Sequence, residues 1–163
     1  MPDHETIERA EKDKEEGKSP STQAGEFVRE EIEHVREGKH GARSTKQAIA
    51  IGLSKARRAG VKLPAPKKAS ARTRKNARRA SAASRSKKRP SKTRSRAITR
   101  ALRREGRSAA SRSALSKQAR SAARKRSAAS RSAAARKAAR TKGPRGRSAA
   151  ARKAARTRAR RRE

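Results

Sequence analysis

The 163-residue sequence has no cysteine, tryptophan or tyrosine, and its one aromatic side chain is Phe27. Without cysteine, the chain forms no disulfide, no catalytic thiolate and no cysteine-ligated zinc site. A single phenylalanine cannot build the base-stacking platforms of RNA-recognition and single-strand-binding folds. No apolar run approaches the roughly 20 residues of a membrane span. The sequence therefore predicts no membrane association.

Acidic residues are scarce outside the first 37 positions. Residues 1–37 have 12 acidic and six basic residues, whereas residues 38–66 have seven basic residues and no acidic one. Residues 67–163, which we call the tail, have 38 basic residues against Glu105 and Glu163. The net charge of +37 is thus concentrated in the tail.

Large apolar side chains are also unevenly distributed, since the tail has only Ile98, Leu102 and Leu115. Ordering the backbone costs about 1–2 kcal/mol per residue, which three large side chains cannot offset over such a length. The composition therefore predicts a mostly α protein, in which a small helical hairpin head is followed by a largely disordered, conditionally helical basic tail.

Helix start and stop signals divide the head, residues 1–63, into helices at about 4–16, 20–37 and 45–59. Asp3 and Ser19 are candidate N-caps, Gly38 is a candidate terminator, and Ser44 with Gln47 forms a capping-box pattern. Apolar residues at helical spacing predict two facing stripes and hence an antiparallel pair of helices. The stripes comprise Ala24, Val28, Ile32 and Val35, flanked by Phe27, on one helix and Ile49, Leu53 and Ala56 on the next.

Composition divides the rest of the chain into three segments. Residues 64–94 are rich in proline, lysine, arginine and serine and are predicted to be a linker. Residues 95–126 contain Ile98, Leu102 and Leu115 at helical spacing and are predicted to form a weak second helical hairpin. Residues 127–163, the last part of the tail, are predicted to be disordered repeats, interrupted at Gly143 and Pro144.

Repeats in the tail predict a cationic helix face. The decamer SAAARKAART occurs at 132–141 and again at 148–157, and SAASRS occurs at 81–86, 108–113 and 127–132. At about 100° per residue, the three basic residues of each decamer fall within an arc of about 100°. Like charges four residues apart oppose the helix by about 0.2–0.5 kcal/mol per pair, so phosphates should favour it.

This density of positive charge predicts a polyanionic partner. Duplex DNA has one phosphate about every 1.7 Å of axis, and neutralising phosphates releases counterions. We therefore expect a cytoplasmic, nucleoid-associated and histone-like protein that binds double-stranded DNA without sequence preference and compacts it. The expected contacts are Lys46, Lys55, Arg57, Arg58, Arg103, Arg104, Arg136, Lys137, Arg140, Arg152, Lys153 and Arg156.

Two alternatives remain open. Phosphate attraction does not distinguish DNA from RNA, so the chain could be an RNA- or ribosome-associated protein. The head could instead be a protein-interaction module, with the tail as a basic tether. A homodimer through the head is compatible with each alternative.

Catalytic and metal-binding patterns are weak. The sequence has no phosphate-binding glycine loop and no nucleophile elbow, so we expect neither an enzyme nor a cofactor. Glu31 and His34 have the Glu-x-x-His spacing of di-metal helix bundles, but a second such motif is missing. We therefore expect surface histidines and no metal. Residues 41–60 are also compatible with half of a helix-turn-helix, although a plain packing helix fits them better.

Two segments resemble known proteins. The sequence from Lys18 to Pro64, "KSPSTQAGEFVREEIEHVREGKHGARSTKQAIAIGLSKARRAGVKLP", resembles the head of an uncharacterised family of small basic bacterial proteins. Residues 95–126 are similar to a second block of that family. The Ala-Lys-Arg-Ser composition of 67–163 resembles linker-histone tails and bacterial histone-like tails. The resemblance implies a bacterial origin and no particular activity.

Overall fold

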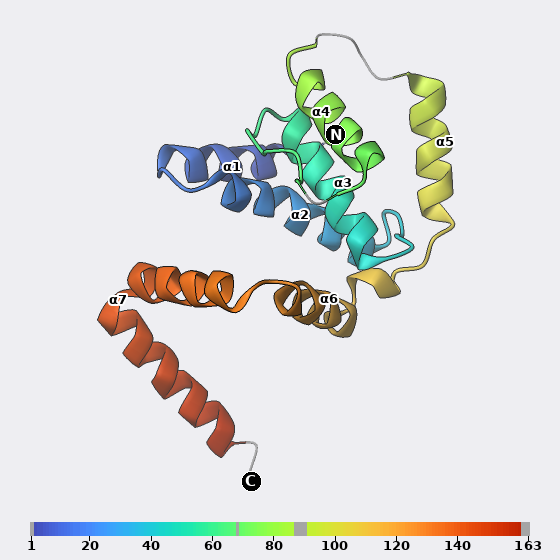
Figure 1. Cartoon of the computed structure of the whole chain (residues 1–163). Coiled ribbons are helices and arrows are strands. Elements are labelled where there is room, and N and C mark those ends of the chain that lie inside the picture. The colour runs from blue at the N-terminus through green and yellow to red at the C-terminus, as the bar shows by residue number, and fades with distance from the viewer. Residues whose placement is uncertain (1, 68, 87–90, 161–163) are drawn as a thin grey trace. The chain divides into compact units, whose positions relative to one another are not determined.

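A computed structural model describes residues 2–67, 69–86 and 91–160, and all regular elements in these ranges are helical (Figure 1). The elements are α1 (His4–Glu15), α2 (Pro20–Glu37), α3 (Thr45–Arg58), α4 (Ala71–Ala83), α5 (Lys92–Arg103), the 3-10 turn η1 (Ser108–Ala110), α6 (Arg112–Arg124) and α7 (Ala128–Ala159). They form two compact units, residues 1–118 and 119–163.

The three helices predicted in the head are confirmed, and their ends follow from local chemistry. Gly38 directly follows α2, and Gly17 lies two residues after the end of α1; they adopt left-handed φ values of 80° and 69°, which costs glycine little. The Ser44 hydroxyl accepts a hydrogen bond from the Gln47 backbone N–H at 3.2 Å, as the capping-box pattern predicted. Asp3 precedes α1 without capping it through its side chain.

The prediction of a largely disordered basic tail is wrong. Four helices, α4 to α7, occupy most of the described part of residues 67–163, and α7 alone has 32 residues. α5, α6 and α7 have no buried residue over their described lengths, so a core of their own does not explain their helical structure.

Local preferences explain this difference. Alanine, arginine and lysine are among the best helix formers, and this part of the chain consists largely of them. Serine hydroxyls also cap α4, α5, α6 and α7, since Ser70, Ser91, Ser111 and Ser127 each accept a hydrogen bond from the backbone N–H three residues on. Each N-cap stabilises a helix by about 1 kcal/mol. The prediction of a disordered tail was based on the missing core and did not take these caps into account.

α2 and α3 pack against each other as the predicted antiparallel pair (Figure 1). Their closest approach is at Gly52, where a Cβ atom would lie 2.7 Å from the Val28 Cα and 2.9 Å from the Phe27 carbonyl oxygen. Phe27 is 1% exposed and lies with Ala10, Ala24 and Ala56 in a cluster that joins α1 to this pair.

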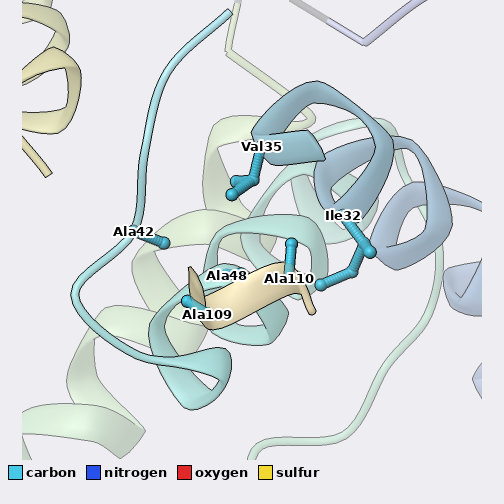
Figure 2. Packing of buried hydrophobic residues seen from close by; sticks show 6 residues of the cluster. All are labelled: Ile32, Val35, Ala42, Ala48, Ala109 and Ala110. Carbon is cyan, nitrogen blue, oxygen red and sulfur yellow. The ribbon is translucent and has the colours of Figure 1, made fainter. Parts of the chain in front are cut away.

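A second cluster brings a distant segment onto the head. Ile32 and Val35 of α2 and Ala48 of α3 pack with Ala42, and Ala109 and Ala110 of η1 cover them (Figure 2). Leu115 of α6 packs against the same cluster.

Hydrogen bonds fix this docked segment, residues 102–110. The Gly41 and Ala42 N–H groups donate to the carbonyl oxygens of Leu102 (2.9 Å) and Gly106 (3.1 Å). The Thr45 hydroxyl donates to the Ala109 carbonyl oxygen at 2.6 Å. A Cβ atom on Gly41 would overlap the Glu105 carbonyl oxygen, so the backbones meet without space for a side chain.

The predicted linker, residues 64–94, contains α4, which packs on α3 and buries Ala77 and Ala80. Lys68 and residues 87–90 of this segment lie outside the described residues. The segment predicted to form a second hairpin, 95–126, contains most of α5 and all of α6. On the expected packing face of α5, Ile98 is 54% exposed and Leu102 is half-buried.

Residues 119–163 contain the end of α6 and all of α7. The long helix α7 is kinked at Gly143, whose φ of 64° and ψ of 176° are not helical, and Pro144 follows. The interruption predicted at Gly143 and Pro144 is therefore confirmed. It leaves one copy of the decamer on each side, at 132–141 and 148–157.

Candidate functional site

The helices that follow the head are the strongest candidates for a binding site. α4, α5, α6 and α7 have five, five, four and eleven basic residues, and none of them has an acidic residue. Most of these side chains are exposed, and their own helices offer them no carboxylate partner. Helices of this composition attract polyanions.

The two decamers of α7 have the same local structure. Arg136, Lys137 and Arg140 of the first copy are exposed, as are their counterparts in the second, Arg152, Lys153 and Arg156. The last residue of each copy turns back to its own helix: the Thr141 and Thr157 hydroxyls donate to the carbonyl oxygens of Lys137 and Lys153, each at 3.0 Å. α7 thus presents one cationic motif twice, on either side of a kink.

The unit of residues 1–118 has an arginine cluster of its own. Arg36, Arg107 and Arg112 line an open cavity of about 340 Å³ with Ala110 and Ser111, at the start of α6. Arg36 Nε donates to the Ala110 carbonyl oxygen at 2.9 Å, which fixes its guanidinium group beside the docked segment. Arg107 passes over Gly38, where a Cβ atom would lie 3.2 Å from its Nη1.

Ten of the twelve predicted nucleic-acid contacts are exposed. They are Lys46, Arg58, Arg103, Arg104, Arg136, Lys137, Arg140, Arg152, Lys153 and Arg156. The first four lie in residues 1–118 and the other six lie on α7, in the unit of residues 119–163.

Lys55 and Arg57 use their charges inside the head. Lys55 Nζ lies 2.8 Å from Glu30 Oε1 and 2.8 Å from Glu31 Oε2. Burial disfavours the Lys55 charge, but these two carboxylates outweigh it and raise its pKa. Arg57 is 8% exposed and donates to the carbonyl oxygens of Leu53 and Pro64, and burial lowers its pKa. Neither residue is free to face a nucleic acid. Both lie in 41–60, so a helix-turn-helix in this segment could not use them as contacts.

The interpretation of His34 and His40 as surface residues is wrong. Their side chains are 12% and 16% exposed, and their rings lie edge to face with centroids 6.2 Å apart. They surround Glu30 and Glu31, which are 3% and 0% exposed. The Glu-x-x-His spacing of Glu31 and His34 was visible in the sequence. The position of His40 beside Glu31, in the turn after α2, was not.

Other acidic groups of the head have partners close by. Arg9 Nε lies 2.9 Å from Glu26 Oε2, and Lys18 Nζ lies 2.7 Å from carboxylate oxygens of Asp13 and Glu16. The hydrogen bonds that Lys18 donates to both carboxylates raise its pKa. The acidic residues of 1–37 thus contribute to the internal ion pairs of the head.

Comparison with known proteins adds one finding. Residues 11–68 match a family of unknown function, DUF6496. The match includes the segment 18–64 for which we expected an uncharacterised family, and it leaves residues 95–126 and most of the tail outside. No curated protein and no solved structure matches the chain. None of the described helices has the length and hydropathy of a membrane span.

Proposed function

We propose that this protein binds double-stranded DNA without sequence preference, as a histone-like nucleoid-associated protein that neutralises and compacts the duplex. The observation that supports this best is the run of four helices, α4 to α7, with basic residues and no acidic one. Phosphates release counterions when such residues neutralise them, and this term needs no contact with bases. The absence of tyrosine and tryptophan further argues against readout by base stacking.

The geometry of α7 fits this role. Each decamer places three basic side chains within an arc of about 100°, so all three can face one phosphate backbone. Arg136 and Arg140 repel each other across one helical turn, as do Arg152 and Arg156. Bound phosphates remove this repulsion, so binding stabilises a helix that is already formed.

The arginine cluster of Arg36, Arg107 and Arg112 gives residues 1–118 a second surface for phosphates. Guanidinium groups bind phosphate oxygens in pairs of parallel hydrogen bonds. Ser111 caps α6 beside this cluster, and the start of a helix favours negative charge. Both units of the chain therefore have groups suited to the DNA backbone.

The test is a salt series of binding by the full chain to two unrelated DNA duplexes of equal length, followed by fluorescence anisotropy. We expect equal affinity for the two sequences and a steep fall with salt. The double variants Arg136→Gln/Arg140→Gln and Arg152→Gln/Arg156→Gln should each flatten the slope of log K against log salt by about 1.8, for two lost contacts.

The matched control is Lys12→Gln/Lys14→Gln, which removes two exposed lysines from the acidic helix α1 and should leave the slope unchanged. If the α7 variants behave like this control, the proposal is wrong. Competition by a structured RNA of equal charge decides between the nucleic acids. An RNA that competes at least tenfold better than DNA at the same salt would make RNA the partner.

A further inference from the structure

The histidine and glutamate cluster of the head contains none of the basic residues of α4 to α7 and has no part in the proposed DNA binding. Glu30, Glu31 and His34 lie on α2, His40 lies in the turn before α3, and Lys55 lies on α3. One ring nitrogen of each histidine and one Glu31 oxygen all lie within 4.8 Å of one another. Groups of this kind in a helical pair either share protons or bind a cation.

The neighbours of His40 fix which nitrogen of its neutral ring carries the hydrogen. His40 Nδ1 lies 3.0 Å from the Gly41 carbonyl oxygen, which can only accept, so Nδ1 carries a hydrogen. In the neutral ring, Nε2 then has a lone pair, and it lies 3.3 Å from Glu31 Oε1. A lone pair facing a carboxylate oxygen is repulsive unless a positive charge lies between them.

His34 is held in a similar way. His34 Nε2 lies 3.1 Å from Asp3 Oδ2, and the hydrogen bond between them lowers the Asp3 pKa. An ionised carboxylate only accepts, so Nε2 carries the hydrogen. His34 Nδ1 is then unprotonated in the neutral ring, and it lies 3.8 Å from Glu30 Oε1. Both histidines thus donate outwards and turn their lone pairs towards the buried glutamates.

Negative charge exceeds positive charge at this place. Glu30 and Glu31 share the single ammonium group of Lys55. Neither oxygen of Glu31 has a partner in hydrogen-bond geometry among the described residues, although Lys55 Nζ and His40 Nε2 lie close to them. A fully buried carboxylate without such partners is costly, so the cluster favours a further cation.

We propose that Glu31, His34 and His40 bind a divalent transition-metal ion, and that the ion is Zn²⁺. Two ligands at about 2.0–2.1 Å in tetrahedral geometry lie about 3.3 Å apart, and the distance from His40 Nε2 to Glu31 Oε1 is 3.3 Å. The outward bonds to Asp3 and to the Gly41 carbonyl are the supports that metal-bound histidines usually have. Imidazole ligands favour zinc over calcium or magnesium. Lys55 holds the other Glu31 oxygen and Glu30 in place.

The alternative occupant is a proton, which would make His40 an imidazolium ion paired with Glu31. The two occupants are distinguished by titrating the untagged, EDTA-treated full chain at neutral pH. Co²⁺ reports tetrahedral coordination by its visible absorption, and Zn²⁺ binding is followed by calorimetry. We expect one equivalent of Zn²⁺ to bind, to displace Co²⁺ and to raise the melting temperature.

The variants His34→Gln and His40→Gln should each weaken Zn²⁺ binding by at least about tenfold, and Asp3→Asn should weaken it by about 10–100-fold without removing a ligand. The control is His4→Gln, because His4 is exposed on α1 and pairs with Glu8 four residues on. Circular dichroism checks that each variant is folded. Should a histidine variant not fold, Asp3→Asn and the zinc-dependent melting of the unaltered chain give the answer.

The proposal is overturned if the unaltered chain binds no stoichiometric Zn²⁺. It is equally overturned if His34→Gln, His40→Gln and His4→Gln all bind Zn²⁺ alike, since the ion would then lie elsewhere. DNA binding is not used as a readout, so the result does not depend on the function proposed above.

Discussion

The head and α7 are both helical, but they are stabilised in different ways. α2 buries Phe27, Ile32 and Val35 and places two glutamates out of contact with solvent. α7 is longer and has no buried residue, so alanine propensity, a serine cap and hydrogen bonds within the helix hold it. The comparison shows that one chain can combine a packed unit with a helix stabilised locally. A mutation should therefore have large effects in the first and small, local effects in the second.

The largest effect is expected from Phe27→Ala. This change removes the one aromatic side chain from the cluster that joins α1, α2 and α3, and should cost about 3–5 kcal/mol of the free energy of unfolding. Amide hydrogen exchange over residues 20–58 measures it. The matched change in the exposed helix, Ile98→Ala, should alter stability by less than about 0.5 kcal/mol. Equal losses in both variants would contradict the comparison.

A smaller effect is expected from Gly52→Ala, since the new Cβ would lie 2.7 Å from the Val28 Cα. Forcing α2 and α3 apart should cost about 1–3 kcal/mol in urea unfolding. Gly25→Ala is the control, because a Cβ atom there meets nothing within 4 Å and Gly25 lies inside α2. This control should stabilise the chain by about 0.5–1 kcal/mol through helix propensity. A destabilised Gly25→Ala would show that propensity does not govern this position.

Thr45→Val tests the docked segment. The buried Thr45 hydroxyl donates to the Ala109 carbonyl oxygen, and its loss leaves that oxygen unsatisfied at a cost of about 1–3 kcal/mol. We expect faster amide exchange in residues 41–48 and 102–110. Thr141→Val removes an exposed hydroxyl bond within α7 and should leave these residues unchanged. Unaltered exchange in Thr45→Val would mean that the docking does not depend on this bond.

The smallest effect is expected from Ser127→Ala at the start of α7. The Ser127 hydroxyl accepts from the Ser130 N–H at 3.2 Å, and losing this cap should cost about 1 kcal/mol within α7 alone. Nuclear magnetic resonance shifts of residues 128–134 report fraying, while the melting of the head should not change. Ser148→Ala, inside the same helix, should instead increase helicity slightly. A lower melting temperature of the head in Ser127→Ala would show that the two regions are coupled.

The sequence was sufficient to predict the helices of the head because their boundaries depend on neighbouring residues. Gly38 and the pair Ser44 and Gln47 act within one helical turn, and the stripe of α2 repeats every three or four positions. The same local reasoning also applies to the tail helices, because each serine cap acts within one helical turn. The prediction of disorder considered the missing core and not these caps.

Contacts between distant residues were not predictable in this way. The hexamer SAASRS ends α4 at 81–86, docks on the head through η1 at 108–113, and starts α7 at 127–132. The same hexamer thus adopts three different structures, which depend on the residues around it in space. For the same reason Lys55 was expected on the surface, whereas the fold places it against Glu30 and Glu31.

The docked segment also has a consequence for how the protein is made. A ribosome delivers the chain from its N-terminus, so α1, α2 and α3 emerge long before Ala109, Ala110 and Leu115. Until then, the side of the head formed by Val35, Ala42 and Ala48 has no cover. The nascent head therefore completes its second apolar cluster only after many arginines of the following helices have also been synthesised.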